Sequence, residues 1–261
     1  MKYLSPRLFV SLLALVLSPA AKAMEFRFLA WDEQVAARPL AVLGGANKDG
    51  VAIKNLHPLK RSPAVDAKLN EASLLVRVLD KKDASGNPID FSVKVAGDVT
   101  HPLVLLLPDP KALSGLRGYV LEDDVANFPW GTYRMLNGTG KELAMRLGSL
   151  AKPLTADWKP LDLMPGGNKP LPVEIAMRDA AAADAMKTVY SAIWKPDPDV
   201  RNLVFVVPGT EPRLGPLAIK VIPENRKILE LEAQAEGAAV HGGTTGGASS
   251  RSAEHRTEEE P

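Results

Sequence analysis

The stretch around residue 138 reads Gly-Thr-Gly-Lys, a combination that could hold a phosphate group. A phosphate-binding loop of the P-loop type needs a glycine, four further residues and then Gly-Lys-Ser/Thr, set between a strand and a helix. Here Glu142 follows the lysine and Met135 stands where the first glycine should be. Asn137 followed by glycine is instead typical of a β-hairpin turn, because both residue types tolerate positive φ. We therefore predict a turn that joins strands at 133–136 and 143–147.

Two histidines, His57 and His101, are the candidates for a general base outside the C-terminal region. A hydrolytic site needs a nucleophile next to such a base. Each histidine directly precedes a proline near the end of a predicted strand, and no serine lies in a Gly-x-Ser-x-Gly motif. We interpret both as turn residues and predict no catalytic residue. A histidine that folding brings next to a distant serine or carboxylate is the alternative.

Metal and glycosidase chemistry have similarly little support. A zinc site needs three or four ligands from His, Cys and acidic residues, and the chain has no cysteine. Acidic residues gather at 122–124 and again at Asp197 and Asp199, and paired acids serve glycosidases and calcium sites. No defined calcium loop surrounds them, and acidic side chains are mostly exposed to water. We predict no metal and no cofactor.

Trp130 and Tyr133 are the candidate binding residues. Trp130 follows a proline in the segment 125–130, which we interpret as a linker between two domains. A tryptophan in such a place packs between domains or serves as a binding anchor, and the general burial of large aromatic side chains favours packing. Tyr133 opens the next predicted strand, so both residues are expected at the domain junction.

The elements that position these residues are short strands. Alternating or wholly apolar segments of strand length recur between prolines and glycines, of which the chain has 22 and 20. This pattern is typical of β-sandwiches and barrels. The predicted strands include 26–31, 74–78, 91–95, 103–107, 116–124, 172–177, 186–194, 202–208 and 217–225.

The second half of the chain repeats the pattern of the first. An apolar strand closed by proline, then a short loop and a second strand ending in an acidic residue, occur at 102–124 and again at 202–225. Phe-Arg-Phe-Leu-Ala-Trp near the start corresponds to Tyr-Arg-Met-Leu-Asn-Gly at the start of the second half. Because a repeat defines the architecture, we predict an all-β chain of two tandem β-sandwich domains, 24–124 and 131–236.

Two segments are ambiguous. Residues 180–183 are strong helix formers, and their place in the repeat favours a loop or a single helical turn. The segment 227–235 fits either a last strand or a short exposed helix.

The first 23 residues have the layout of a secretory signal peptide. Lys2 and Arg7 form a basic start, an apolar run over 8–17 is too short to cross a membrane comfortably, and Ala-Lys-Ala precedes the predicted cleavage site. We expect export and no membrane span after cleavage. Residues 237–261 contain almost no large apolar side chains, so we expect a disordered tail.

Charge and cysteine content narrow the partners and the compartment. Without the three basic residues of the leader, 29 basic residues stand against 31 acidic ones, which gives a net charge of about −2. A near-neutral chain without a basic face is not expected to bind nucleic acid. An exported chain with no cysteine cannot form disulfides, which favours the periplasm or cell surface of a bacterium.

The whole layout resembles exported bacterial proteins of unassigned function that are built from tandem immunoglobulin-like domains. The residues that carry this resemblance are the signal, Pro-Leu-Val-Leu-Leu-Leu-Pro-Asp-Pro at 102–110, the segment 128–137 and the segment 202–212. The resemblance implies a fold and no functional residue. We predict a non-enzymatic binding or structural module of the cell envelope, with an envelope protein or polysaccharide as partner. The alternative is a hydrolase of envelope or extracellular polymers with its site at the domain junction.

Overall fold

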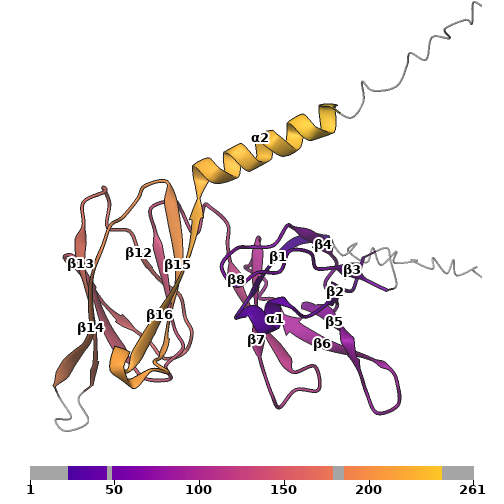
Figure 1. Ribbon diagram of the computed structural model, residues 1–261, viewed down its shortest axis with the longest axis horizontal. Coiled ribbons are helices and arrows are strands. Elements are labelled where there is room, and N and C mark those ends of the chain that lie inside the picture. The colour runs from indigo at the N-terminus through magenta and orange to yellow at the C-terminus, as the bar shows by residue number, and fades with distance from the viewer. Residues whose placement is uncertain (1–22, 46–48, 179–184, 243–261) are drawn as a thin grey trace, which may run out of the picture. The chain divides into compact units, whose positions relative to one another are not determined.

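The computed structural model describes residues 23–45, 49–178 and 185–242. Sixteen strands, two α-helices and one short 3-10 helix make up the regular structure of these residues, and the strands form four four-stranded sheets. The predicted all-β class is therefore confirmed (Figure 1). The chain divides into two compact units, which are described separately below. Unit 1 comprises Met1–Leu56 and Arg61–Leu121, and unit 2 comprises His57–Lys60 and Glu122–Pro261.

Unit 1 contains two sheets that share one apolar core. One sheet has the order β4-β1-β7-β8 and the other has the order β3-β2-β5-β6. The core takes side chains from both sheets, including Phe26, Phe28, Leu74, Val76 and Val104, all fully buried. The bounds are β1 Met24–Ala30, α1 Glu33–Ala36, β2 Leu40–Val42, β3 Val51–Ala52, β4 Val65–Ala67, β5 Ser73–Lys82, β6 Pro88–Lys94, β7 Pro102–Pro108 and β8 Leu116–Glu122.

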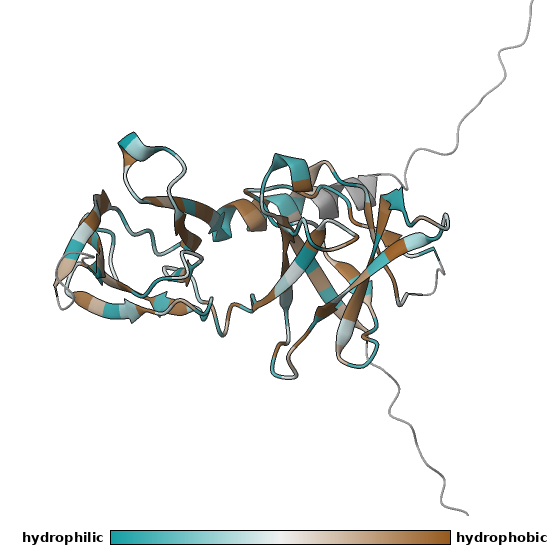
Figure 2. Ribbon diagram, turned by 90° about the horizontal axis from the view of Figure 1, so that it is seen from below, coloured by the Kyte–Doolittle hydropathy of each residue, from teal (hydrophilic) through white to brown (hydrophobic). Residues whose placement is uncertain are grey.

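Unit 2 is built in the same way. Its sheets have the orders β12-β9-β15-β16 and β11-β10-β13-β14. Apolar residues on alternate strand positions meet in one core, and Figure 2 shows brown, hydrophobic positions recurring along the strands. The bounds are β9 Tyr133–Asn137, β10 Leu143–Leu147, β11 Leu150–Leu154, β12 Leu161–Leu163, β13 Leu171–Arg178, β14 Met186–Trp194, β15 Val200–Pro208, η1 Pro212–Leu214, β16 Leu217–Asn225 and α2 Arg226–Gly242.

The two units have the same strand connectivity. In each, the first strand pairs antiparallel with the fourth and parallel with the seventh, while the second pairs with the third and fifth. The registers also correspond, because Arg27 lies opposite Leu103 in unit 1 and Arg134 lies opposite Leu203 in unit 2. These pairs place 26–31 and 133–138 at equivalent positions, as the sequence comparison aligned them.

The predicted hairpin at Asn137 is wrong. β9 pairs with β12 and β15, whereas β10 pairs with β11 and β13, so the connection at 138–142 crosses from one sheet to the other. Neither Asn137 nor Gly138 has a positive φ, and the left-handed residue is Gly140 at φ 70°.

Hydrogen bonds of the Asn137 side chain explain this difference. Its amide group donates to the carbonyl oxygens of Lys141, at 2.7 Å, and Leu154, at 3.0 Å. Its Oδ1 accepts from the backbone N–H and the hydroxyl of Thr139. Asn137 is fully buried, and its side chain forms hydrogen bonds with the loop that follows it. The chain therefore does not form a tight hairpin turn here. The Gly-Thr-Gly-Lys run is a loop, and it has no helix after it to hold a phosphate.

The ambiguous segments are resolved in part. Residues 186–194 form strand β14 as predicted, and 227–235 belong to the helix α2. The helix continues to Gly242, so it includes six residues that the sequence assigned to the tail. The segment 180–183, the leader up to residue 22 and residues 243–261 lie outside the described residues. Within the described part of the chain, none of the helices has the length and apolarity needed to cross a membrane.

Asp199 fixes the start of α2 to unit 2. Its carbonyl oxygen accepts the backbone N–H of Arg226 at 2.9 Å, and its carboxylate binds the side chains of Arg226 and Lys227, the latter at 2.6 Å. Asn225 caps the helix by accepting the backbone N–H of Lys227. The hydrogen bond from Lys227 and the nearby charges lower the pKa of the Asp199 carboxyl group.

We expect the start of α2 to loosen in acid. A carboxyl group with a lowered folded-state pKa stabilises the fold above its unfolded value, about 3.9, and this contribution is lost as the pH falls through the lower folded value. NMR chemical shifts of Lys227 and Ile228 should therefore titrate below about pH 4. Asp199→Asn should abolish that titration and weaken the helix start already at pH 7. The control Asp157→Asn, which removes an acid bonded to Thr155, should change neither.

Candidate functional site

A hollow of about 490 Å³ opens in unit 1 at the turn between β5 and β6. The hollow is open to water rather than enclosed. One wall is the hairpin turn, and the other includes the tip of the loop between β7 and β8. The lining residues are Lys81, Lys82, Asp83, Ala84, Ser85, Ile89 and Leu113.

The hairpin wall is held in one shape by Asp83. Its Oδ1 accepts the backbone N–H groups of Ser85, at 2.9 Å, and Asn87, at 2.8 Å, while the Asn87 side chain donates to Oδ2. Gly86, at φ 84°, supplies the left-handed conformation that the turn needs. These hydrogen bonds lower the pKa of the Asp83 carboxyl group, and the one from the Asn87 backbone has the largest effect. The Asp83 carboxylate therefore stabilises the turn.

The loop wall is fixed by Arg38 and Ser114. Arg38 binds the Asp80 carboxylate with two nitrogens and donates from Nη2 to the Ser114 carbonyl oxygen at 3.2 Å. The Ser114 hydroxyl donates to the Leu116 carbonyl oxygen at 2.8 Å. The hydrogen bond from Arg38 also lowers the pKa of the Asp80 carboxyl group. These hydrogen bonds hold the loop that carries Leu113 against the neighbouring residues Arg38 and Leu116.

Two lysines, Lys81 and Lys82, line this hollow. Among the described residues, no hydrogen bond and no ion pair engages the ammonium group of Lys81 or Lys82. The ammonium of Lys81 lies by the loop, since a Cβ built on Gly115 would be 3.4 Å from Lys81 Nζ. Two lysines and one aspartate, Asp83, give the lining residues a net charge of +1.

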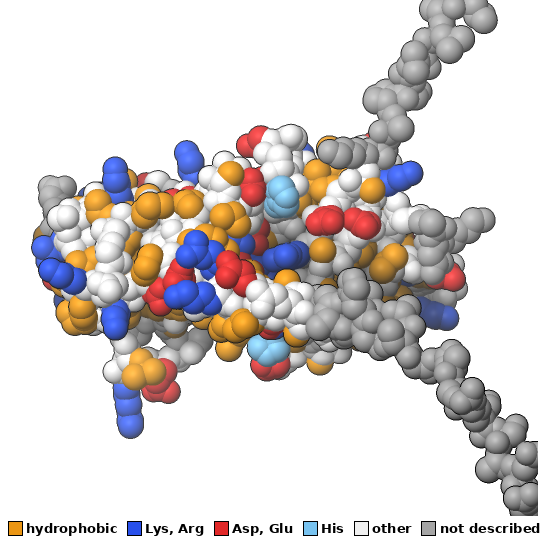
Figure 3. All heavy atoms as spheres, turned by 90° about the horizontal axis from the view of Figure 1, so that it is seen from above, with side chains coloured by type: hydrophobic (Ala, Val, Ile, Leu, Met, Phe, Trp, Pro, Cys, Tyr) orange, Lys and Arg blue, Asp and Glu red, His pale blue; other side chains and the backbone are white. Residues whose placement is uncertain are grey.

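An exposed leucine marks the same loop in both units. Leu113 is 81% exposed, and Leu214, in the equivalent loop between β15 and β16, is also 81% exposed. Single exposed apolar residues are common, but here both units have one in the equivalent loop. Elsewhere the charges are mixed, and Figure 3 shows acidic and basic side chains interspersed on the face it draws.

The described lining residues of the hollow do not form a catalytic pair. Ser85 is the hydroxyl present, and the carboxylate beside it, Asp83, accepts its backbone N–H. The lining combines the charges of two lysines with the apolar side chains of Ile89 and Leu113.

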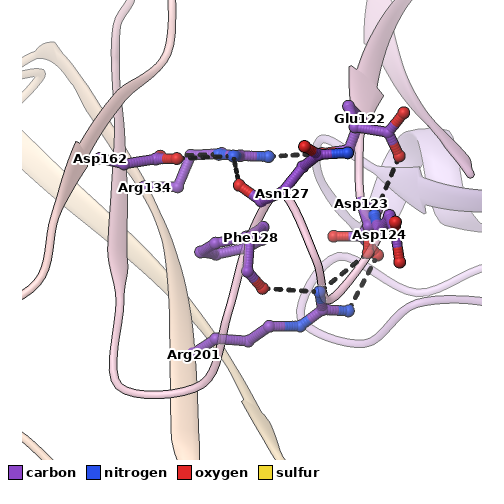
Figure 4. Close-up of polar contacts among 8 residues, drawn as sticks. All are labelled: Glu122, Asp123, Asp124, Asn127, Phe128, Arg134, Asp162 and Arg201. Atoms are coloured by element: carbon purple, nitrogen blue, oxygen red, sulfur yellow. Dashed lines mark hydrogen bonds and ion pairs between the residues drawn. The ribbon is translucent and has the colours of Figure 1, made fainter. Parts of the chain in front are cut away.

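A second polar cluster lies in unit 2 and surrounds the segment 122–130 (Figure 4). Arg201, on β15, donates from Nε to Glu224 Oε2 at 2.6 Å and from Nη1 to the carbonyl oxygens of Asp123 and Phe128. Its Nη2 also pairs with the Asp123 carboxylate. Arg201 is 2% exposed, and both acids are buried. The guanidinium thus holds the segment by its backbone.

Arg134 repeats this role from β9. Two of its nitrogens bind the Asp162 carboxylate, at 2.8 and 2.6 Å. It also donates to the carbonyl oxygens of Glu122 and Asn127. Between the two arginines, four backbone carbonyls of the segment 122–130 are bound. We interpret this arginine cluster as a structural support, because its charges are satisfied within unit 2.

Aromatic rings complete the arginine cluster and locate the first predicted site residue. The buried ring of Phe128 lies between the guanidiniums, 4.4 Å from Arg134 and 5.0 Å from Arg201. Trp130 packs over Arg201, with its ring 5.1 Å from the guanidinium carbon. Both are cation–π contacts. Trp130 is therefore held by an internal contact and is only partly exposed.

Tyr133, the second predicted site residue, lies elsewhere. Its side chain belongs to the core of unit 2, where its ring stacks on Trp194 at 5.2 Å. Burial, with a smaller effect of Asp197, raises the pKa of its hydroxyl group. Tyr133 lies opposite Asn202 in the sheet, and successive strand residues face opposite ways, so Tyr133 and Arg201 project from opposite faces. The structure does not bring Trp130 and Tyr133 together.

The two histidines are exposed and belong to different units. His57 Nδ1 accepts the backbone N–H of Leu59 at 2.9 Å, and His101 Nδ1 lies 3.2 Å from the hydroxyl of Thr100. Neither lines the hollow. Within the described ranges, no group of three or more potential metal ligands comes together.

Sequence reasoning did not single out the residues of the hollow or the two arginines. Arg201 gave a local signal, since it begins the apolar run of β15 and a charge there needs a partner. No local sequence signal marked Lys81, Lys82 and Leu113, because these residues come together only after folding. In the comparisons with known proteins, no family model matches the chain and no curated protein matches it.

Proposed function

We propose that this protein is an exported, non-enzymatic binding module of a bacterial cell envelope. In this proposal residues 1–23 are a cleaved signal, and the chain then acts in the periplasm or at the cell surface. Residues 24–124 and 131–236 are two tandem β-sandwich domains of the immunoglobulin-like kind, with 125–130 as linker and the chain after the helix as a disordered spacer. The repeated strand order of the two units supports this organisation.

The observation that carries the proposal is the hollow of unit 1. Hydrogen bonds hold both of its walls, and its lining includes two lysines, whose ammonium groups make no hydrogen bond or ion pair to the described residues, and the exposed Leu113. Rigid walls lower the entropy cost of binding. A hydrolase would need a base beside a nucleophile, and the Asp83 carboxylate accepts the backbone N–H groups of Ser85 and Asn87.

Cross-linking in the native envelope tests the binding function. We expect mass spectrometry of the purified cross-linked material to identify one envelope protein in near-stoichiometric amount. Cross-linking of a sample in which the protein is denatured first gives the background. Absence of any partner, together with release of polymer fragments by the purified protein, would contradict the proposal and favour the hydrolase.

A further inference from the structure

We propose that the hollow of unit 1 binds an acidic peptide segment, with a carboxylate on Lys81 and Lys82 and a neighbouring aliphatic side chain on Ile89 and Leu113. This inference rests on the proposed binding function and names the chemical class of its ligand.

Charge selects an anion. Each carboxylate that could neutralise the two lysines is already engaged: Asp80 binds Arg38 and Asp83 binds the amides of its own turn. The lining residues Lys81, Lys82 and Asp83 keep one net positive charge, which a carboxylate from a ligand would neutralise. A charge-assisted hydrogen bond of this kind is roughly twice as strong as one between neutral groups.

The apolar part of the hollow selects a side chain next to that carboxylate. Leu113 is 81% exposed and Ile89 lies at the floor, 9% exposed. Covering Leu113 removes apolar surface from water, which stabilises the complex by about 25 cal/mol per Å². A ligand that presents only charge would leave this surface wet, so the site matches a segment in which acidic and aliphatic residues lie close together.

The adjacent strand favours a peptide over a polysaccharide. Ile89 belongs to β6, which lies at the edge of its sheet and pairs with β5 alone among the described strands. The free edge of such a strand offers backbone N–H and C=O groups to an extended peptide. Sugar rings pack their flat faces on aromatic side chains, and no aromatic residue is among those that line the hollow.

NMR titration of the isotope-labelled protein tests this inference. The probe is an acetylated, amidated peptide of alternating glutamate and leucine, and its match has glutamine in place of glutamate. We expect the acidic peptide to shift the amide signals of 81–89 and 111–115, and the glutamine peptide to bind at least tenfold more weakly. The double substitution Lys81→Gln and Lys82→Gln should weaken the acidic peptide by a similar factor.

The control is Lys68→Gln with Lys94→Gln, which removes two exposed lysines of unit 1 outside the hollow and should leave binding unchanged. Leu113→Ser should weaken the acidic peptide without changing the fold, because the side chain is exposed. Shifts with polygalacturonate but not with the peptide would overturn the inference in favour of an acidic polysaccharide. No shifts with either would overturn the hollow as a site, while a partner captured by cross-linking would still support the binding function.

Discussion

Replacing Arg201 by methionine is expected to lower the free energy of unfolding of unit 2 by about 3 to 5 kcal/mol. The substitution leaves the carboxylates of Asp123 and Glu224 buried without their cation, and it removes the donor to two backbone carbonyls. The cost arises because a buried charge that loses its partner keeps its full desolvation penalty. Urea unfolding followed by tryptophan fluorescence measures it, since Trp130, Trp158 and Trp194 all lie in unit 2.

Two further variants isolate the cause. Adding Asp123→Asn and Glu224→Gln to Arg201→Met should recover much of the loss, because no unpaired charge then remains buried. Arg146→Met breaks an ion pair to Glu174 in which the arginine side chain is 52% exposed, and it should cost at most about 1 kcal/mol. A loss below about 1 kcal/mol for Arg201→Met itself would mean that water solvates the arginine cluster.

Removing the Phe128 ring is expected to destabilise unit 2 by a similar amount, about 3 to 5 kcal/mol for Phe128→Ala. The ring is fully buried and lies between the guanidiniums of Arg134 and Arg201. Its loss leaves a cavity and removes two cation–π contacts, and the expected total covers both effects. The same urea experiment measures the effect.

Phe128→Leu separates the two contributions, since leucine restores much of the volume but none of the aromatic face. We expect an intermediate loss. In a double-mutant cycle with Arg134→Met, the two substitutions should be non-additive by roughly 0.5 to 3 kcal/mol, as expected for residues in contact. Strict additivity would show that the ring and the guanidinium are not coupled, and the structural role given to Phe128 would then be wrong.

The alternation of apolar residues was enough to place most strands. The apolar runs 103–107 and 202–208 were assigned as strands from their length and the prolines that end them, and the structure has strands there. The failed motif at Gly-Thr-Gly-Lys likewise excluded a phosphate loop from the sequence alone. Both conclusions depend on residues within about ten positions of one another.

The local sequence did not predict which strands pair with each other. Asn137 followed by glycine favours a hairpin locally, but burial of Asn137 and its hydrogen bonds to Lys141 and Leu154 make it the end of one sheet. Local turn preferences are worth about 1 kcal/mol, and a buried amide with satisfied hydrogen bonds outweighs them.

The sequence by itself determined the all-β class, the positions of the longer strands and the internal similarity of the two halves, whereas β2, β3, β4, β11 and β12 were not predicted. Only the tertiary structure decided which side chains meet. Lys81 and Leu113 are 32 positions apart, and Arg201 lies 78 positions from Asp123, yet each pair shares one site or one ion pair. Sheet order and register bring such residues together, and these arise from packing a whole core, so no local pattern encodes them.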